Sequence, residues 1–263
     1  MAPELALSEL LAPLRSDPAG SVLLFDIDGT LAPIVRHASD AQIPEPTRRQ
    51  LIALARRYGI VACVSGRPAV VARQMVGIGS IAYVGNHGCE LLSPGSAQVV
   101  LDQRVAAHAN EVAEFARRAA TPTAQRARVR LEDKGPSVAF HWRGAPDEQA
   151  ALAVIEQIEV DARAAGLVPA RGRKVLEVRP PVPIDKGRGV ALLMRRRHPA
   201  AGLYVGDDRT DIDGFRGLRA VVGEGAICVA VGSDEAPEEL LEAASVVVDG
   251  TSGVSELLRE LLR

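Results

Sequence analysis

Short apolar runs alternate with segments of helical period along most of the chain. The runs cover residues 22–26, 60–64, 81–84, 203–206, 226–231 and 245–248. Between the first two runs, apolar residues recur at helical spacing, which predicts a helix with Thr47 as its N-cap and Gly59 as its stop. Strands that alternate with helices predict an α/β fold, with a mainly parallel sheet covered by helices on both faces.

The middle of the chain has a different pattern. A helix-like stretch, two strand-like runs, another helix and two more strands follow one another, and the segment ends in a proline-rich stretch at 180–183. From Ser137 to Arg143 apolar and polar residues alternate, which is typical of a sheet with one buried and one solvated face. The pattern predicts a smaller α/β domain at 103–183, inserted into a core domain made of residues 1–102 and 184–263.

Composition and charge exclude several classes of partner. The 263 residues are 47% hydrophobic and 24% charged, and the formal net charge of -2 provides no basic field for nucleic acid. The arginines at 195–197 end a predicted helix, where cations suit the helix dipole. No apolar stretch reaches the roughly 18 residues that a membrane span requires.

The N-terminal residues and the cysteines indicate the compartment. Residues 1–14 contain no Lys or Arg, so they lack the basic start of a secretion signal and are interpreted as a short amphipathic helix. The three cysteines are widely spaced and outside any CxxC pattern, which disfavours disulfide and zinc frameworks. We therefore expect a cytoplasmic protein without nucleic acid or membrane partners.

Two carboxylates, Asp26 and Asp28, follow the first apolar run and precede Gly29. Because side chains alternate along a strand, both leave the chain on the same side, at the edge where open α/β sheets bind ligands. There they repel each other unless a cation or a shared proton intervenes. The pair predicts a metal-assisted phosphoryl site; the alternative is a simple turn at a strand end.

Two further segments have features of phosphate sites. The second run ends in Ser65-Gly66-Arg67-Pro68, and a predicted helix follows from Ala69, so its first N–H groups and the serine could bind an anion. Lys186 opens another predicted helix where the middle region returns to the core, and could neutralise a carboxylate and a phosphoryl oxygen. The alternatives are an ordinary serine cap and an exposed lysine.

Three more carboxylates, Asp207, Asp208 and Asp211, follow the apolar run that ends at Val205. Such a concentration of negative charge has a low cost when a hard cation shares it, and oxygen ligands favour Mg²⁺. An acidic surface turn is the alternative.

Taken in order, these four motifs resemble those of the haloacid dehalogenase (HAD) superfamily of phosphatases. The resemblance implies a HAD-like Rossmannoid core with a parallel sheet, and a smaller C2-type α/β cap that determines substrate specificity. The middle region, with Asn86-His87-Gly88 before it and Lys174-Val175-Leu176-Glu177 within it, looks like that of trehalose-6-phosphate phosphatases. Two positions depart from the commonest form of the fourth motif. This chain has Ile212 where that form has an acidic residue, and Gly214 where it has alanine.

The resemblance implies a two-step phosphatase mechanism. Asp26 would be the nucleophile that forms an aspartyl phosphate, while Asp28 would protonate the leaving oxygen and then activate water. Asp28 would need surroundings that raise its pKa, whereas Asp26 would stay ionised. Phosphate would be held by Ser65, Gly66, Arg67 and Lys186, and Mg²⁺ by Asp26, the carbonyl of Asp28, Asp207, Asp208 and Asp211.

The resemblance also implies a substrate, trehalose 6-phosphate, hydrolysed to trehalose and phosphate. The expected sugar contacts are Asn86, His87, Gly88, Glu132, Lys134, His141, Arg143, Lys174 and Glu177. Ideal strand alternation puts Lys174 and Glu177 on opposite faces, so both reach one sugar only with a bulge or strand end between them. We expect a monomer whose partner is a small sugar phosphate, coupled in function to a trehalose-phosphate synthase.

Three alternative functions stay open on the sequence. A phosphatase of the same architecture could act on sucrose phosphate or on a glucosyl or mannosyl glycerate phosphate. A mutase would pass the phosphoryl group to another sugar hydroxyl. A non-catalytic sugar-phosphate sensor is disfavoured because both Asp26 and Asp28 are present.

Overall fold

The computed structural model describes residues 7–35 and 40–263. The first six residues of the expected N-terminal helix lie outside this range. The chain divides into two compact units, one formed by residues up to Val100 together with Ile184–Arg263, the other by Leu101–Pro183. The roles of hydrolase core and cap stay predictions for these two units.

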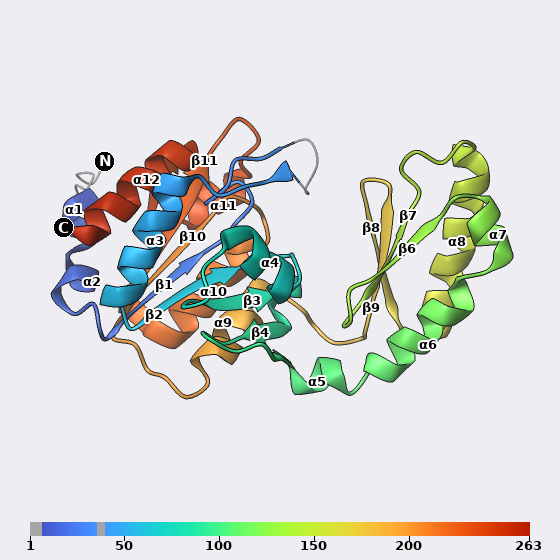
Figure 1. Cartoon of the computed structure of the whole chain (residues 1–263), viewed down its shortest axis with the longest axis horizontal. Helices are drawn as coiled ribbons and strands as arrows, with labels where there is room; N and C mark the ends of the chain where they lie inside the picture. The colour runs from blue at the N-terminus through green and yellow to red at the C-terminus, as the bar shows by residue number, and fades with distance from the viewer. Residues whose placement is uncertain (1–6, 36–39) are drawn as a thin grey trace. The chain divides into compact units, whose positions relative to one another are not determined.

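A sheet forms the centre of the first unit (Figure 1). It has eight strands in the order β12-β11-β10-β1-β2-β3-β4-β5. The strands from β12 to β3 run parallel, and β4 pairs antiparallel with β3. The bounds are β1 Ser21–Phe25, β2 Ile60–Val64, β3 Ala82–Gly85, β4 Glu90–Leu92, β5 Val99–Leu101, β10 Ala201–Gly206, β11 Ala226–Gly232 and β12 Val246–Asp249. The predicted α/β class with a mainly parallel sheet is confirmed.

Successive residues of the central strands pack into two different apolar cores, one on each face of the sheet. Both faces are therefore buried. In β1, Leu23 and Phe25 pack into one core and Val22 and Leu24 into the other. Continuously apolar runs are therefore the expected sequence of these strands, since each face is covered by helices.

The first core contains residues of α3, α4 and α12, and the second contains residues of α9, α10 and α11. Figure 1 shows α12 beside α3, and Gln50 of α3 donates a hydrogen bond to the carbonyl of Ser255 in α12. The helices of this unit are α1 Leu7–Leu10, α2 Ala12–Ser16, α3 Glu45–Arg57, α4 Ala69–Val76, α9 Lys186–Met194, α10 Asp211–Val222, α11 Glu238–Ala243 and α12 Gly250–Leu262, with 3₁₀ turns η2 Asn86–Gly88 and η3 Gly223–Gly225.

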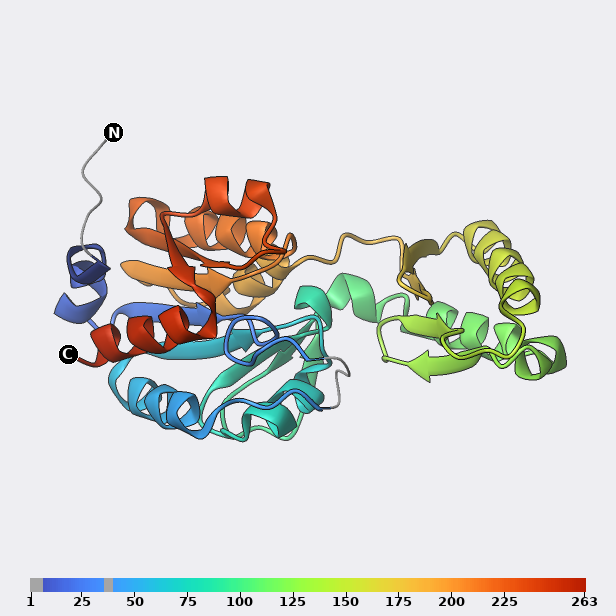
Figure 2. The ribbon, with the colours of Figure 1, turned by 90° about the horizontal axis from the view of Figure 1, so that it is seen from above.

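The second unit is a four-stranded antiparallel sheet, ordered β6-β7-β9-β8, with its helices on one face (Figures 1 and 2). Apolar residues of β7 and β9 pack with α6 and α8 into a separate core that includes Phe140 and Trp142. Its elements are α5 Gln103–Ala106, α6 Ala109–Ala119, α7 Pro122–Arg126, β6 Arg130–Asp133, β7 Val138–His141, α8 Glu148–Ala164, β8 Val168–Gly172 and β9 Val175–Arg179.

Two local predictions are wrong. Thr47 is not an N-cap: α3 begins earlier, at Glu45, and Thr47 is buried within its first turn. The single helix expected at the start of the middle region is three short helices, α5, α6 and α7. Among the described residues, no helix combines the length and the apolar character needed to cross a membrane.

Candidate active site

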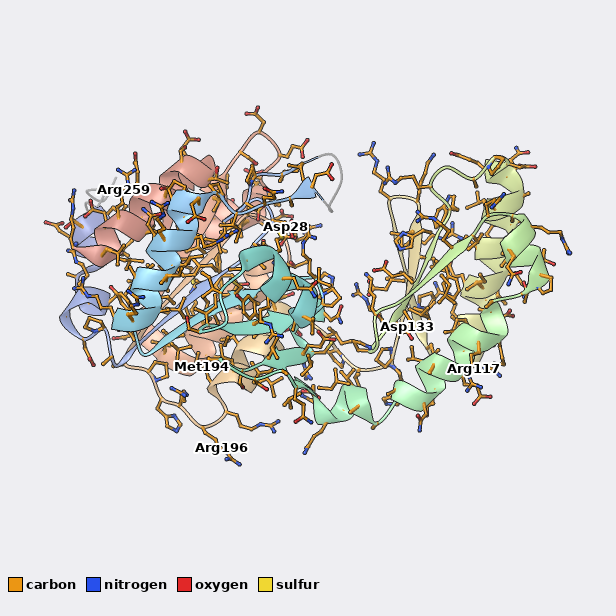
Figure 3. The ribbon with its side chains drawn as sticks, in the orientation of Figure 1. Asp28, Arg117, Asp133, Met194, Arg196 and Arg259 are labelled. Carbon is orange, nitrogen blue, oxygen red and sulfur yellow. The ribbon has the colours of Figure 1, made fainter. Side chains whose placement is uncertain are left out.

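The predicted chemical groups of the first unit come together where three neighbouring strands end. Strand β1 lies between β10 and β2, and the residues that follow these strands are Asp26, Asp207 and Ser65. Asp28, two residues farther along, lies at this edge of the unit (Figure 3). Parallel strands deliver their carboxyl ends to one edge, so sheet order alone places these side chains near one another.

Lys186 lies at the centre of this group. It is the first residue of α9, whose N-cap Asp185 accepts a hydrogen bond from the backbone N–H of Arg188. The Lys186 side chain is 2% exposed, and its Nζ lies 2.9 Å from Oδ1 of Asp26 and 2.7 Å from Oδ1 of Asp211. The exposed-lysine alternative is thus excluded.

Asp211 is fully buried and accepts four hydrogen bonds. Its Oδ1 accepts from Lys186 Nζ and, at 2.9 Å, from the hydroxyl of Tyr204. Its Oδ2 accepts from the backbone N–H groups of Asp207 and Asp208, each at 3.1 Å. Asp211 therefore fixes both the lysine and the loop that carries the two other acids.

The residues fit a divalent metal. One carboxylate oxygen from each of Asp26, Asp207 and Asp211 lies within 4.8 Å of the other two. Since both oxygens of Asp211 are engaged by protein donors, Asp26 and Asp207 are the carboxylates best suited to direct ligation. Thr30 orients Asp207 by donating to its Oδ1 at 3.1 Å. Gly29 makes room for it, because a Cβ there would lie 1.9 Å from Oδ2 of Asp207.

Burial dominates the electrostatics of this cluster. It raises the pKa of Asp26 to about 7, against the lowering effect of Lys186. It likewise raises the pKa of Asp207 to about 6 and that of Asp211 to about 8. For Asp208, the attraction of Lys186 and hydrogen bonds from Thr210 outweigh burial, so its pKa is lowered. The single ammonium group of Lys186 cannot neutralise all of these carboxylates. Bound protons or a cation supply the remaining positive charge.

Asp28 is paired with an arginine from the predicted phosphate loop. Arg67 forms a bidentate pair with it, with Nε 2.7 Å from Oδ2 and one terminal nitrogen 2.6 Å from Oδ1. The side chain of Asp28 is 41% exposed, whereas that of Asp26 is 6% exposed. The sequence could not show where the Arg67 side chain would point, so this pair was not predicted.

The predicted phosphate loop packs against the Asn86-His87-Gly88 turn. Ser65 is buried, and its Oγ accepts from the backbone N–H of Arg67 at 3.1 Å. The backbone N–H of His87 donates to the Ser65 carbonyl, and a Cβ on Gly66 would lie 2.7 Å from the His87 ring. All four sequence motifs and this turn thus belong to one edge of the first unit.

Most of the expected sugar contacts in the second unit lie on the sheet face opposite its helices. His141 bonds to Glu132 at 2.7 Å across the β6–β7 pair. Glu177 accepts from Ser137 and pairs with Arg179, and Lys134 Nζ lies 3.8 Å from it. Burial raises the pKa of Glu177, but Arg179, Lys134 and Ser137 together hold it below its ordinary value.

Lys174 and Arg143 lie apart from this polar set. Lys174 occupies the turn between β8 and β9 with a φ of 62°, and its Nζ pairs with Glu148 at the start of α8. Arg143 is exposed and donates to the carbonyl of Arg173 in the same turn. The structure therefore does not bring Lys174 and Glu177 together.

Three residues that support the site were not predicted from the sequence. Thr30 and Tyr204 hold Asp207 and Asp211, and Glu90 accepts hydrogen bonds from Ala69 and Asn86. A signal existed for two of them: Thr30 lies two residues after Asp28, and Glu90 is an acid directly before two leucines.

Comparisons with known proteins agree with this geometry. A sequence model of the trehalose-phosphatase family matches residues 24–245. A trehalose 6-phosphate phosphatase from Zea mays is 29% identical over 256 residues, which are 91% of this chain and 69% of that protein. A trehalose-phosphate phosphatase from Mycobacterium marinum is 31% identical over 236 residues, which are 81% of this chain. This chain spans only 54% of the length of that second relative.

Solved structures show the same fold. The structure of Aspergillus fumigatus trehalose-6-phosphate phosphatase is 25% identical, with a TM-score of 0.65 over 100% of this chain and 99% of that chain. A haloacid dehalogenase-like hydrolase from Bacteroides thetaiotaomicron has a TM-score of 0.61 at 16% identity and covers 91% of this chain and 98% of that one. The predicted HAD-like fold is confirmed.

Proposed function

We propose that this chain, which belongs to the trehalose-phosphatase family, is a Mg²⁺-dependent phosphatase that hydrolyses trehalose 6-phosphate to trehalose and phosphate. The observation that carries the proposal is the buried cluster in which Asp26 lies next to Lys186 and within 4.8 Å of Asp207 and Asp211. A carboxylate with a cationic neighbour at the carboxyl edge of a parallel sheet is placed to attack a phosphoryl group.

The proposed reaction has two steps. A carboxylate oxygen of Asp26 bonds to phosphorus while the bond from phosphorus to the sugar oxygen breaks, and Asp28 delivers a proton to that oxygen. Asp28, now ionised, takes a proton from water as the water oxygen attacks the aspartyl phosphate, which releases phosphate and restores both acids. A phosphate oxygen gives Arg67 an alternative partner, so substrate binding would free Asp28 from its bidentate pair.

Three residues assist these steps. Lys186 neutralises negative charge on Asp26 and on the transferring group, and Asp211 keeps its ammonium in place. Ser65 holds a phosphoryl oxygen together with backbone N–H groups of its loop. Mg²⁺ would be bound by Asp26 and Asp207, with the Asp28 carbonyl, Asp208 and Asp211 in support. It would neutralise negative charge on the phosphoryl oxygens.

For the sugar, we propose that the polar face of the second unit provides the contacts, with Glu132, His141 and Glu177 as its hydrogen-bonding groups. A cap of this kind would exclude water and select the disaccharide. The chain would act in the cytoplasm after a trehalose-phosphate synthase. Sucrose phosphate and glucosyl or mannosyl glycerate phosphates are the competing substrates.

The test is phosphate release across a panel of trehalose 6-phosphate, sucrose phosphate and glucose 6-phosphate. We expect release from trehalose 6-phosphate to be fastest, to stop with EDTA and to return with Mg²⁺. Asp26→Asn should fold like the wild type by circular dichroism and lose activity by at least a thousandfold, since the amide keeps the shape without the nucleophile. A flat substrate profile, or turnover retained by this variant, would contradict the proposal.

A further inference from the structure

A buried glutamate that has no part in the proposed chemistry lies beneath the phosphate loop. Glu90 is the first residue of β4, opposite Gly85 of β3, and is 7% exposed. Its Oε2 accepts from the backbone N–H of Ala69, and its Oε1 accepts from the side-chain amide of Asn86, both at 2.7 Å. Both oxygens of one buried carboxylate are therefore held by nitrogen donors of two different segments.

Those two donors belong to the two segments that form this side of the site. Ala69 begins α4 directly after the Ser65–Pro68 loop, and Asn86 begins the η2 turn. The backbone already joins them, since Asn86 N–H donates to the Arg67 carbonyl at 2.8 Å. A charged acceptor gives shorter and stronger hydrogen bonds than a neutral one, and its negative charge suits the start of a helix.

The η2 turn needs such support because its backbone is strained. Asn86 and His87 have φ values of 46° and 57°, in the left-handed region that non-glycine residues seldom adopt. Conformations of this kind persist when the surrounding structure holds them. The turn brings the His87 ring against Gly66, so its conformation decides how closely histidine and phosphate loop approach each other.

We propose that Glu90 is a positioning residue for sugar-phosphate binding: it ties the Asn86-His87-Gly88 turn to the phosphate loop so that both present a single rigid surface to the substrate. The expected effect of Glu90 on kcat/KM rests on the proposed function. Its expected effect on the backbone of the two segments does not. Glu90 touches no reacting group and acts through Ala69 and Asn86.

The substitution Glu90→Gln tests the pairing at constant size. The new amide has one acceptor, so its NH₂ group must face either the N–H of Ala69 or the NH₂ of Asn86, and one hydrogen bond is lost. We expect kcat/KM for trehalose 6-phosphate to fall at least tenfold, mainly through KM. The double variant Asn86→Asp with Glu90→Gln restores both bonds, because the amide then accepts from Ala69 and donates to the new carboxylate. Because Asn86 is itself an expected sugar contact, the double variant is assessed by hydrogen exchange and not by kcat/KM.

A second measurement is independent of catalysis. Hydrogen exchange of the backbone amides in residues 65–71 and 85–89 should quicken in Glu90→Gln and return towards wild-type rates in the double variant. The matched control is Glu159→Gln in α8, another carboxylate with two nitrogen donors, from Arg163 and Arg171, which should change neither measurement.

The outcomes separate the two proposals. A wild-type chain inactive on trehalose 6-phosphate would defeat the proposed function, while the exchange data would still decide the role of Glu90. The positioning role is overturned if Glu90→Gln leaves hydrogen exchange and KM unchanged, or if exchange in the double variant stays as fast as in Glu90→Gln. Recovery of wild-type exchange rates in the double variant supports the positioning role, even where Glu90→Gln alone does not fold.

Discussion

Replacing Lys186 with methionine probes the charge balance of the buried cluster. Methionine keeps most of the aliphatic stem but removes the ammonium from Asp26 and Asp211, to which Nζ lies at 2.9 and 2.7 Å. The lysine is 2% exposed, so water cannot replace the lost charge without opening the site. We expect a large loss of stability in addition to a loss of activity.

The size of that loss follows from the burial. Removing one partner of a buried ion pair costs about 3–5 kcal/mol in the free energy of unfolding, because a charge is left without compensation. In a protein of this size each kcal/mol shifts Tm by about 2–4 °C, so Tm should fall by about 6–20 °C in EDTA at pH 8.

The loss should depend on pH. Burial raises the pKa of Asp26 to about 7 and of Asp211 to about 8 despite Lys186, and removing the lysine raises both further. A carboxyl whose pKa is higher in the folded than in the unfolded chain favours folding at low pH, and this contribution is lost as pH rises through the folded pKa. The variant should therefore lose far less stability at pH 5, where both acids take protons, than at pH 8.

Intrinsic fluorescence distinguishes the two units during unfolding. The sole tryptophan, Trp142, belongs to the second unit, whereas the three tyrosines, Tyr58, Tyr83 and Tyr204, are buried in the first. Tyrosine emission excited at short wavelength should report the shifted transition in Lys186→Met. An equal loss at pH 5 and pH 8 would show that Lys186 stabilises the fold through its aliphatic stem, and would refute the charge argument.

Two further substitutions test other parts of the structure. Gly214→Ala should lower Tm by several degrees, because its Cβ would lie 2.3 Å from Cζ of Tyr204 and such overpacking costs about 1–3 kcal/mol. The control is Gly79→Ala, whose Cβ would have no atom within 4 Å and which should leave Tm unchanged. Glu177→Ala should lower kcat/KM for trehalose 6-phosphate at least tenfold but hydrolysis of a small aryl phosphate less than twofold, and equal losses on both substrates would remove Glu177 from the sugar site.

The sheet and its reactive edge were predictable because both depend on local patterns. Apolar runs of strand length mark buried parallel strands, and the residues that follow them must lie at the carboxyl edge whatever the order of the strands. Asp26, Ser65 and Asp207 could therefore be assigned to one edge before their distances were known. The start of α3 was misplaced because Pro46 favours a helix that already includes Glu45, and proline suits the first turn.

Some side-chain partners could not be predicted from the sequence. They depend on the dihedral angle of a single residue or on an element far away in the chain. The positive φ of Lys174 turns its side chain to Glu148, whereas regular alternation would keep it on the sheet. The Arg67–Asp28 pair joins residues 39 positions apart, and nothing local to either motif specifies it. Such contacts need the packed structure, because several orientations of a long side chain are compatible with the same backbone.

The pattern of pKa shifts in the cluster bears on where a cation would bind. Asp208 has its pKa lowered, so protein donors already compensate its charge, whereas burial raises the pKa of Asp26, Asp207 and Asp211. In the proposed mechanism, compensation by protons would leave Asp26 without the negative charge that its attack on phosphorus requires. Compensation by a divalent ion keeps it ionised. The burial of the three acids therefore supports the proposal that a metal bound by Asp26 and Asp207 keeps Asp26 ionised for the proposed attack.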